Sequence, residues 1–188
     1  MPTVVTHAAV PLCLGLGLGT KNIPPSLLLA GVACSMVPDL DVIAFKFGIA
    51  YANAFGHRGF THSLLFAFAL PTLALLLKRW FKVGYWRIWW FLTVSLLSHS
   101  VLDSLTTGGM GVGWLWPWSQ ERFFAPVQVI KVAPFQLAQY LKPNGIAVIQ
   151  SELLWVWLPG IVMMIGLIML RKQPVHSPLN HQHNLSQQ

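Results

Sequence analysis

The chain has 188 residues, of which 55% are apolar and only 9% are charged, and its mean hydropathy is +0.60. These values exclude an ordinary soluble domain and predict an all-α fold, a polytopic membrane helical bundle with about five spans. The net charge of +7 would suit a nucleic-acid-binding protein, but most Lys and Arg residues stand in short clusters at the ends of apolar runs. That placement is typical of residues that set membrane topology, so we expect the lipid bilayer as partner and no nucleic acid.

The apolar runs leave no room for a separate soluble domain. We expect one membrane-embedded domain over residues 1–172, with an interfacial cap at 106–151, and a polar, disordered tail at 173–188. Cys13 and Cys34 fall inside separate apolar runs without metal-ligand spacing, so they are interpreted as packing residues. The N-terminus lacks the basic region of a signal peptide, and we expect the first run to be retained.

The first two apolar runs each carry polar residues that interrupt them. Residues 6–19 predict a short first span, with His7 near its start. A second run at 27–47 follows Ser26, which is a favourable helix cap. Pro38 interrupts this run and lacks a backbone donor, so we expect non-helical backbone there, lining a polar cavity at membrane depth.

Three further spans follow. Residues 60–77 are apolar, and at about 1.5 Å per residue they roughly match the thickness of the hydrocarbon core. A fourth span is predicted at 87–105. Residues 106–151 mix tryptophan, glycine and proline, which indicates a structured cap at the headgroup level. The fifth span is predicted at 152–172, opening with Glu152.

The basic residues predict an orientation. If there are five spans, one side of the membrane receives Lys21, Lys78, Arg79, Lys82, Arg87, Arg171 and Lys172. This side is expected to be cytoplasmic, because positive charge accumulates there. The external side then receives His7, Asp39, Asp41, His57, His62, His99, Asp103 and Glu152. Ionisable residues are costly at membrane depth, so their convergence on one face predicts a functional site.

The spacing of these residues favours a shared site. His99 and Asp103 are four positions apart, which places both side chains on one helical face. Asp39 and Asp41 are two positions apart, and in irregular backbone they would point the same way and chelate one ion. Any one of these residues alone would be interpreted as a helix cap or an interfacial residue. Their number, in a chain with five carboxylates, favours a metal site.

The stretch from His57 to His62 supplies two more imidazoles around a turn that Gly59 allows, with His62 in the first helical turn. Arg58 has the planar fork that binds phosphate or carboxylate oxygens, so we expect it to contact an anionic substrate. Glu152 is a candidate general base, although it could also favour the helix N-terminus or support a ligand.

Mixed imidazole and carboxylate ligation is typical of Zn, Mn, Fe or Ni. We expect one or two divalent ions, Zn first and Mn or Fe as alternatives. The predicted metal ligands are His7, Asp39, Asp41, His57, His62, His99 and Asp103. Of these, His7 and His57 could instead support the ligands through hydrogen bonds. A polar tail without structure accounts for His176, His181 and His183 better than a second metal site does. Glu121 and Arg122, in the cap, are interpreted as solvated.

Several motifs together resemble those of a known family. They are Pro38-Asp39-Leu40-Asp41, His57-Arg58-Gly59-Phe60-Thr61-His62-Ser63, His99 with Asp103-Ser-Leu-Thr-Thr-Gly-Gly, Leu115-Trp116-Pro117-Trp118-Ser119 and Arg122-Phe123-Phe124-Ala125-Pro126. The combination resembles the YdjM-like family of bacterial inner-membrane proteins, described as membrane-bound metal-dependent hydrolases. The resemblance spans nearly the whole chain and implies a bacterial inner-membrane location and a hydrolase activity without implying a substrate. Some members of that family are described as belonging to the DNA-damage regulon.

The leading hypothesis is a metal-dependent hydrolase acting on a lipid or an amphipathic phosphate or acyl ester at the external, periplasmic face. A second hypothesis is a non-enzymatic membrane protein in which the cluster binds or transports a metal ion or protons. A third treats the metal as a structural staple. Spacing leaves the third open, because a catalytic site differs from a structural one by an open coordination position.

Overall fold

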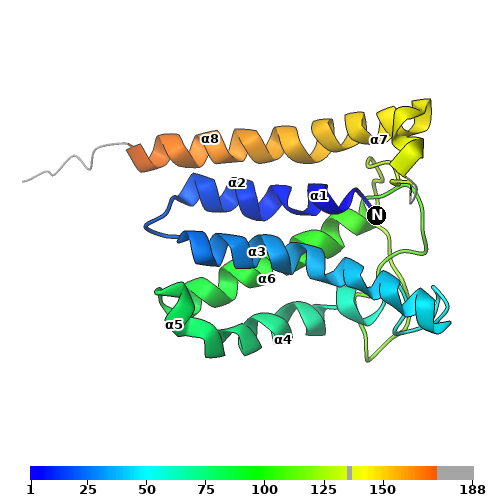
Figure 1. The fold of residues 1–188 in the computed structure, drawn as a ribbon, viewed down its shortest axis with the longest axis horizontal. Helices are drawn as coiled ribbons and strands as arrows, with labels where there is room; N and C mark the ends of the chain where they lie inside the picture. Colours follow the sequence, from blue (N-terminus) through cyan, green and yellow to red (C-terminus); the bar gives the residue numbers. More distant parts are fainter. Residues whose placement is uncertain (135–136, 173–188) are drawn as a thin grey trace, which may run out of the picture.

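The computed structural model describes residues 1–134 and 137–172, and every regular element in those ranges is a helix. The helices form rods that lie side by side along the long axis of the bundle (Figure 1). The predicted all-α membrane bundle is therefore confirmed. The predicted tail at 173–188 lies outside the described residues.

The first three rods are built from several helices each. The first contains α1 (Val4–His7) and α2 (Ala9–Leu18), and the second contains α3 (Pro25–Met36) continued by the 3₁₀ helix η1 (Val37–Phe47). The third contains η2 (Phe60–His62), α4 (Leu64–Ala74), η3 (Leu75–Leu77) and α5 (Lys78–Phe81).

The last two rods complete the bundle. The fourth is the single helix α6 (Tyr85–Ser104). After the short η4 (Leu137–Leu141), the fifth contains α7 (Pro143–Glu152), the π-helical turn η5 (Leu153–Trp157) and α8 (Leu158–Lys172).

Helix α6 is the centre of the bundle, packing against α3 on one side and α4 on another. Its faces contribute Ile88, Phe91 and Leu92 to an apolar core shared with Leu27 of α3 and Phe81 of α5. Because α6 is surrounded by other helices, it tolerates serines, a histidine and an aspartate that a lipid-facing helix would not. The most buried helix is therefore the one that carries polar residues to the site.

Three helical segments are long and apolar enough to cross a membrane: Pro25–Phe47, Leu64–Phe81 and Pro143–Lys172. Helix α8 buries none of its side chains and exposes large apolar ones such as Leu170, as expected of a helix that faces lipid. The count of five spans stays a prediction, because Val4–Leu18 is shorter and α6 is more polar.

Two local expectations were wrong. The backbone at Pro38 is helical rather than non-helical, because Pro38 stands in the first turn of the 3₁₀ helix η1, a position that tolerates proline. The last helix begins at Pro143 rather than at Glu152, with the proline at its first turn. Residues 143–151, expected in the cap, therefore belong to the fifth rod.

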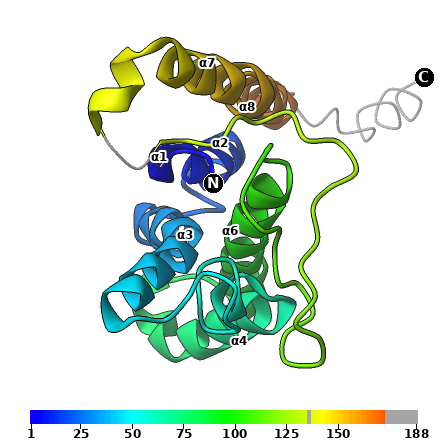
Figure 2. The same cartoon turned by 90° about the vertical axis from the view of Figure 1, so that its right-hand side faces the viewer.

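A mostly non-helical segment between α6 and α7 crosses the end of the bundle at which the chain starts (Figure 2). It is pinned by two isolated bridges, Thr106 with Ile130 and Val112 with Phe123. The Arg58 carbonyl accepts a hydrogen bond from the Gly113 amide, which ties the segment to the loop before η2 (2.8 Å). This segment encloses the polar residues described next.

Close packing of α3 on α6 predicts a large effect of adding one methyl group. In Gly31→Ala the new Cβ would clash with the Phe91 ring and crowd the Ser95 hydroxyl. We expect a loss of about 1–3 kcal/mol in the free energy of unfolding, measured as a lower thermal midpoint in detergent. The control is Gly166→Ala in α8, where nothing lies within 4 Å, and its midpoint should not fall. Equal midpoints for both variants would contradict the described α3–α6 contact.

Candidate metal centre

The predicted site residues gather at the end of the bundle that carries the chain start and α7 (Figure 1). They come from α1 (His7), η1 (Asp39 and Asp41), the loop before η2 (His57), η2 (His62) and α6 (His99 and Asp103). Apart from Asp41, which is half-buried, none of these residues is more than 5% exposed. The predicted convergence of these residues is therefore observed.

Four side chains offer ligand atoms within 4.8 Å of one another: Asp39, His62, His99 and Asp103. We call these four residues the central cluster. His62 Nε2 lies 2.9 Å from His99 Nε2 and 3.3 Å from Asp103 Oδ2. His99 Nε2 lies 3.6 Å from Asp39 Oδ1. A tetrahedral ion with bonds of 2.0–2.2 Å would hold its ligand atoms about 3.4 Å apart, so these separations fit one ion.

His7 adds a further donor at the edge of the central cluster. Its ring stacks on the His99 ring with centroids 3.7 Å apart. Its Nε2 lies 3.7 Å from Asp39 Oδ2 and 3.7 Å from Asp103 Oδ1. The same ion could therefore accept His7 as a fifth ligand.

The outer nitrogens of the two central imidazoles are held by other groups. The Ser35 carbonyl accepts a hydrogen bond from His99 Nδ1 (2.7 Å), which leaves the lone pair of His99 on Nε2, facing the cluster. His62 Nδ1 lies 3.3 Å from Asp41 Oδ2 on the side away from the cluster. Metal-binding histidines are usually oriented in this way by a carbonyl or a carboxylate.

Hydrogen-bond satisfaction separates Asp41 from the other two aspartates. Asp41 accepts hydrogen bonds from His57 Nδ1 (2.6 Å), the Arg58 amide (3.1 Å) and the Thr61 hydroxyl (2.7 Å). Within residues 1–134 and 137–172, neither oxygen of Asp39 or of Asp103 has a hydrogen-bond partner. Buried polar groups are normally satisfied, and an orphaned carboxylate is costly. Asp39 and Asp103 therefore fit a bound cation, whereas Asp41 fits a support.

The two aspartates of η1 take different positions because of the helix type. A 3₁₀ helix has three residues per turn, so positions i and i+2 point about 120° apart. Asp39 faces His7 and His99, and Asp41 faces His57 and His62. The expectation that both aspartates point the same way was wrong, because it assumed irregular backbone.

Charge supports one divalent ion. The site holds three carboxylates. Among the lysines and arginines of the described residues, Arg58 alone forms an ion pair with one of them, Asp103. With neutral imidazoles, two negative charges are left unbalanced in an apolar surrounding, where a charge is expensive. A single divalent cation would balance them.

His57 and His62 lie outside the three segments that are long and apolar enough to span a membrane. Their pKa values respond to burial and to the neighbouring carboxylates. Burial lowers the pKa of His57, although the hydrogen bond to Asp41 acts in the opposite direction. Burial also acts to lower the pKa of His62, but the carboxylates of Asp103 and Asp41, each 3.3 Å from a ring nitrogen, outweigh it and raise that pKa to about 9. The two carboxylates thus favour a positive charge beside them, which a proton on His62 supplies when no cation is bound and which a bound cation would replace.

The contacts of Arg58 differ from the predicted contact with an anionic substrate. Its side chain is fully buried, with Nε 2.9 Å from Asp103 Oδ2 in an ion pair that lacks hydrogen-bond alignment. Nη1 donates to the Gly108 carbonyl and Nη2 donates to the Thr106 hydroxyl, both at 3.0 Å. The guanidinium thus faces protein groups on each side rather than an external anion, and it adopts a left-handed backbone (φ 63°).

Glu152 does not join the ligand group. Its carboxylate accepts hydrogen bonds from the Thr3 amide (2.6 Å), the Thr3 hydroxyl (2.7 Å) and the Thr6 hydroxyl (2.6 Å). Thr6 directly precedes His7, so Glu152 fixes α1 against α7 and thereby places the His7 ring. The structure gives this residue a positioning contact in place of the predicted general-base contact.

Three supporting residues were missed by the sequence analysis. Thr61 stands inside the His57–Ser63 motif and donates to Asp41, so its motif was a usable signal. The Ser35 carbonyl contacts His99 through the backbone, for which the sequence carries no signal. Arg122 was interpreted as solvated, but it donates to the carbonyls of Tyr51, Asn53 and His57. It holds the loop that presents His57.

The fold and the buried cluster define a class: a polytopic helical membrane protein with a His/Asp cluster that could bind metal. The chain belongs to the YdjM inner membrane protein family, whose model matches residues 1–175. The predicted family resemblance is thereby confirmed.

Two relatives are informative. Inner membrane protein YbcI of Escherichia coli K12 is 67% identical over 174 residues, covering 92% of this chain and all of YbcI. Inner membrane protein YdjM of the same strain is 40% identical over 86 residues, covering 42% of this chain and 38% of YdjM. No solved structure matches the chain. The relatives are named as inner membrane proteins, which agrees with the predicted membrane and its lipid contact.

The role of Arg122 can be tested through the loop that it holds. Arg122→Gln removes hydrogen bonds from a charged donor, each of which contributes about 1.5–3 kcal/mol. We expect the amides of Gly56 and Gly59 to exchange with deuterium at least about tenfold faster. Glu121→Gln is the matched control, because Glu121 is exposed beside Arg122. Unchanged exchange in both variants would contradict a supporting role for Arg122.

Proposed function

We propose that this chain is a metal-dependent hydrolase of the inner membrane that uses one divalent ion held by the central cluster. The observation that carries the proposal is a set of buried potential metal-ligand atoms on His7, Asp39 and Asp103 that have no hydrogen-bond partner among the described residues. They lie beside the Nε2 atoms of His62 and His99. Leaving such atoms unsatisfied inside a membrane bundle is costly, and a metal ion would compensate both carboxylates and bind one ring nitrogen of His7.

The donor set supports Zn, with Mn or Fe as alternatives. It offers imidazole nitrogens and carboxylate oxygens, which suit these ions. Neither cysteine belongs to the groups of possible ligands among the described residues. Asp39, His62, His99 and Asp103 are the proposed ligands, with His7 as a fifth. Asp41 and His57 are proposed as supports, because they hydrogen-bond to each other at 2.6 Å.

When bound, such an ion would acidify a water molecule near neutral pH and polarise a phosphoryl or acyl oxygen. The residues of this chain contribute orientation. Asp41 lies against His62 Nδ1, the Ser35 carbonyl fixes the His99 tautomer, and Arg58 balances part of the charge of Asp103. Glu152 holds the helical turn before His7.

A groove of about 420 Å³ supports an approach route for substrate. It runs between residues 107–109 and α7, and Lys131 and Asn144 line it. Its floor includes Gly108, whose carbonyl accepts a hydrogen bond from Arg58, the partner of Asp103. An ester with a phosphate near Lys131 and an apolar tail in the bilayer would fit this groove. The substrate class we propose is therefore an amphipathic phosphate or acyl ester.

The charge distribution supports a periplasmic site. Lys21, Lys78, Arg79, Lys82, Arg87, Arg171 and Lys172 belong to the end of the bundle away from the cluster. All five carboxylates and the other five basic residues belong to the cluster end, so the net charge of +7 resides at the far end. A cytoplasmic location of that end would follow from the preference of positive charge for the cytoplasm.

A structural staple is the second candidate, and the burial of the central cluster favours it. The proposed ligands come from α1, η1, η2 and α6, so one ion would join four segments far apart in sequence. Ion transport is less well supported, because no Asp or Glu of the chain belongs to the basic end. A pathway would need polar groups along its whole length.

Metal content tests the ligand assignment. All proteins compared would carry His176→Gln, His181→Gln and His183→Gln, which removes adventitious binding by the tail. We expect about one equivalent of divalent metal in the otherwise unchanged chain and a loss in Asp39→Asn or His99→Gln, measured by elemental analysis after gel filtration.

Asp41→Asn separates a supporting residue from a ligand. Loss of an outer hydrogen-bond partner typically weakens metal binding by about 10–100-fold, so this variant should regain full stoichiometry at high metal concentration. Asp39→Asn should not regain it. Identical titrations for the two variants would contradict the assignment of Asp41 as a support.

Turnover tests the hydrolase itself. Purified protein in liposomes would be given fluorogenic phosphomonoesters, phosphodiesters and acyl esters, each with a short or a long apolar chain. We expect hydrolysis of at least one long-chain ester that chelation abolishes and added metal restores. Glu121→Gln should retain it and Asp39→Asn should lose it. If chelation lowers the thermal midpoint and no ester is hydrolysed, the ion is a staple.

A further inference from the structure

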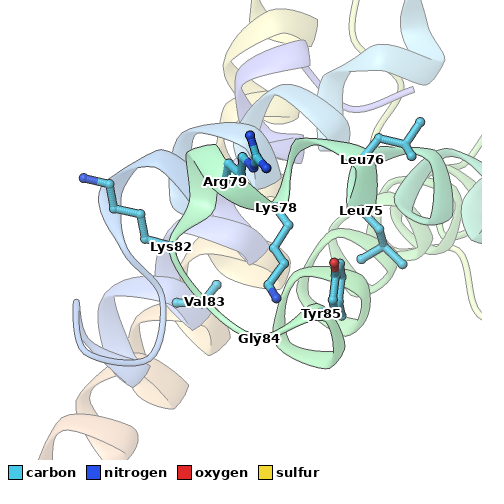
Figure 3. Close-up of a pocket in the computed structure, with 8 residues that line it drawn as sticks. All are labelled: Leu75, Leu76, Lys78, Arg79, Lys82, Val83, Gly84 and Tyr85. Atoms are coloured by element: carbon cyan, nitrogen blue, oxygen red, sulfur yellow. The ribbon is translucent and has the colours of Figure 1, made fainter.

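A second cavity lies at the opposite end of the bundle from the central cluster. It has a volume of about 780 Å³, and its lining includes Leu75, Leu76, Lys78, Arg79, Lys82 and Tyr85 (Figure 3). We call it the basic groove. It lies where α5 ends, and Lys82 adopts a left-handed backbone there (φ 55°) before α6 begins.

The positive charge of the basic groove is not balanced. Three of its side chains are cationic, and within residues 1–134 and 137–172 none of the three forms an ion pair with a carboxylate. The carboxylates of the chain belong to elements at the other end. Lys78 Nζ lies 4.0 Å above the Tyr85 ring, which holds this ammonium group on one side of the groove.

The walls of the basic groove are amphipathic. Trp80 stands between Arg79 and Lys82 in sequence, Trp86 follows Tyr85, and the two side chains are 76% and 73% exposed. Indole rings favour the headgroup region, so this level of the bundle matches the membrane interface. Leu75 and Leu76 line the groove one turn earlier along the third rod, inside the apolar segment Leu64–Phe81. A ligand here would need a negative head and an apolar tail.

We propose that the basic groove binds the phosphate of an anionic phospholipid in the leaflet that surrounds the α5 end. Lys78 and Arg79 would contact the headgroup phosphate, and Leu75 and Leu76 would contact an acyl chain. The Lys82 side chain points away from Lys78 and Tyr85 (Figure 3), and its charge would add to the attraction of the anion. Basic pockets between membrane helices bind anionic headgroups in this way. This site is separate from the proposed metal centre and does not depend on it.

Basic residues at a helix end also set topology without binding a particular lipid. The test must therefore distinguish lipid binding in the groove from a general effect of positive charge at this end of the bundle. The full chain in nanodiscs would be released into native mass spectrometry with phosphatidylglycerol or phosphatidylcholine of identical acyl chains. The groove variant is Lys78→Gln, Arg79→Gln and Lys82→Gln together. The control variant is Lys21→Gln, Arg171→Gln and Lys172→Gln together, which removes the same charge from the same end. Tyr85→Leu adds a variant that changes no charge and leaves topology signals intact.

We expect the unchanged chain to retain the anionic lipid at least about tenfold more than the zwitterionic one. The groove variant and Tyr85→Leu should lose this preference, and the control variant should keep it. Inorganic phosphate at millimolar concentration should not displace the lipid, because the apolar wall contributes. Equal retention of both lipids, equal loss in the groove and control variants, or displacement of the lipid by phosphate alone would overturn the proposal.

Discussion

The rest of the site depends on two carboxylates, Asp39 and Asp103, that accept no hydrogen bond from the part of the chain that the structure describes. A charge inside an apolar bundle costs several kcal/mol unless a partner compensates it. Arg58 supplies one such partner at 2.9 Å from Asp103. The buried imidazoles of His7, His62 and His99 lie within 4.0 Å of one or both carboxylates. The polar face of α6 can exist because other helices shield it from lipid, and the capping segment closes the end of the bundle over it.

The local backbone conformation determines which aspartate faces the central cluster and which supports a histidine. Continuation of α3 as a 3₁₀ helix turns Asp39 toward the central cluster and Asp41 toward the His57 loop. Asp41 is then satisfied by three donors, and it can hold His62 without competing for an ion. Glu152 has an equivalent task at the other side, where it holds Thr6 before His7. The site therefore separates residues with free lone pairs from residues that keep them in place.

The fold and most of the site could be predicted where the signal is local. Hydropathy locates the apolar helices, and the four-residue spacing of His99 and Asp103 places both on one face, with His99 Nε2 4.0 Å from Asp103 Oδ2. The contacts of Arg58 and Glu152 could not be predicted, because their partners lie far away in sequence. Arg122 likewise acts on carbonyls brought near it by the fold, which composition does not reveal.

The central claim is that one divalent ion sits among imidazole and carboxylate ligands. X-ray absorption at the metal edge, recorded on the chain without its three tail histidines, tests it most directly. The account predicts nitrogen and oxygen neighbours at about 2.0–2.2 Å, imidazole scattering from at least two rings, and no sulfur at about 2.3 Å. His99→Gln should remove one ring from that pattern. A sulfur ligand, or a spectrum of a hydrated ion without imidazole, would contradict the account.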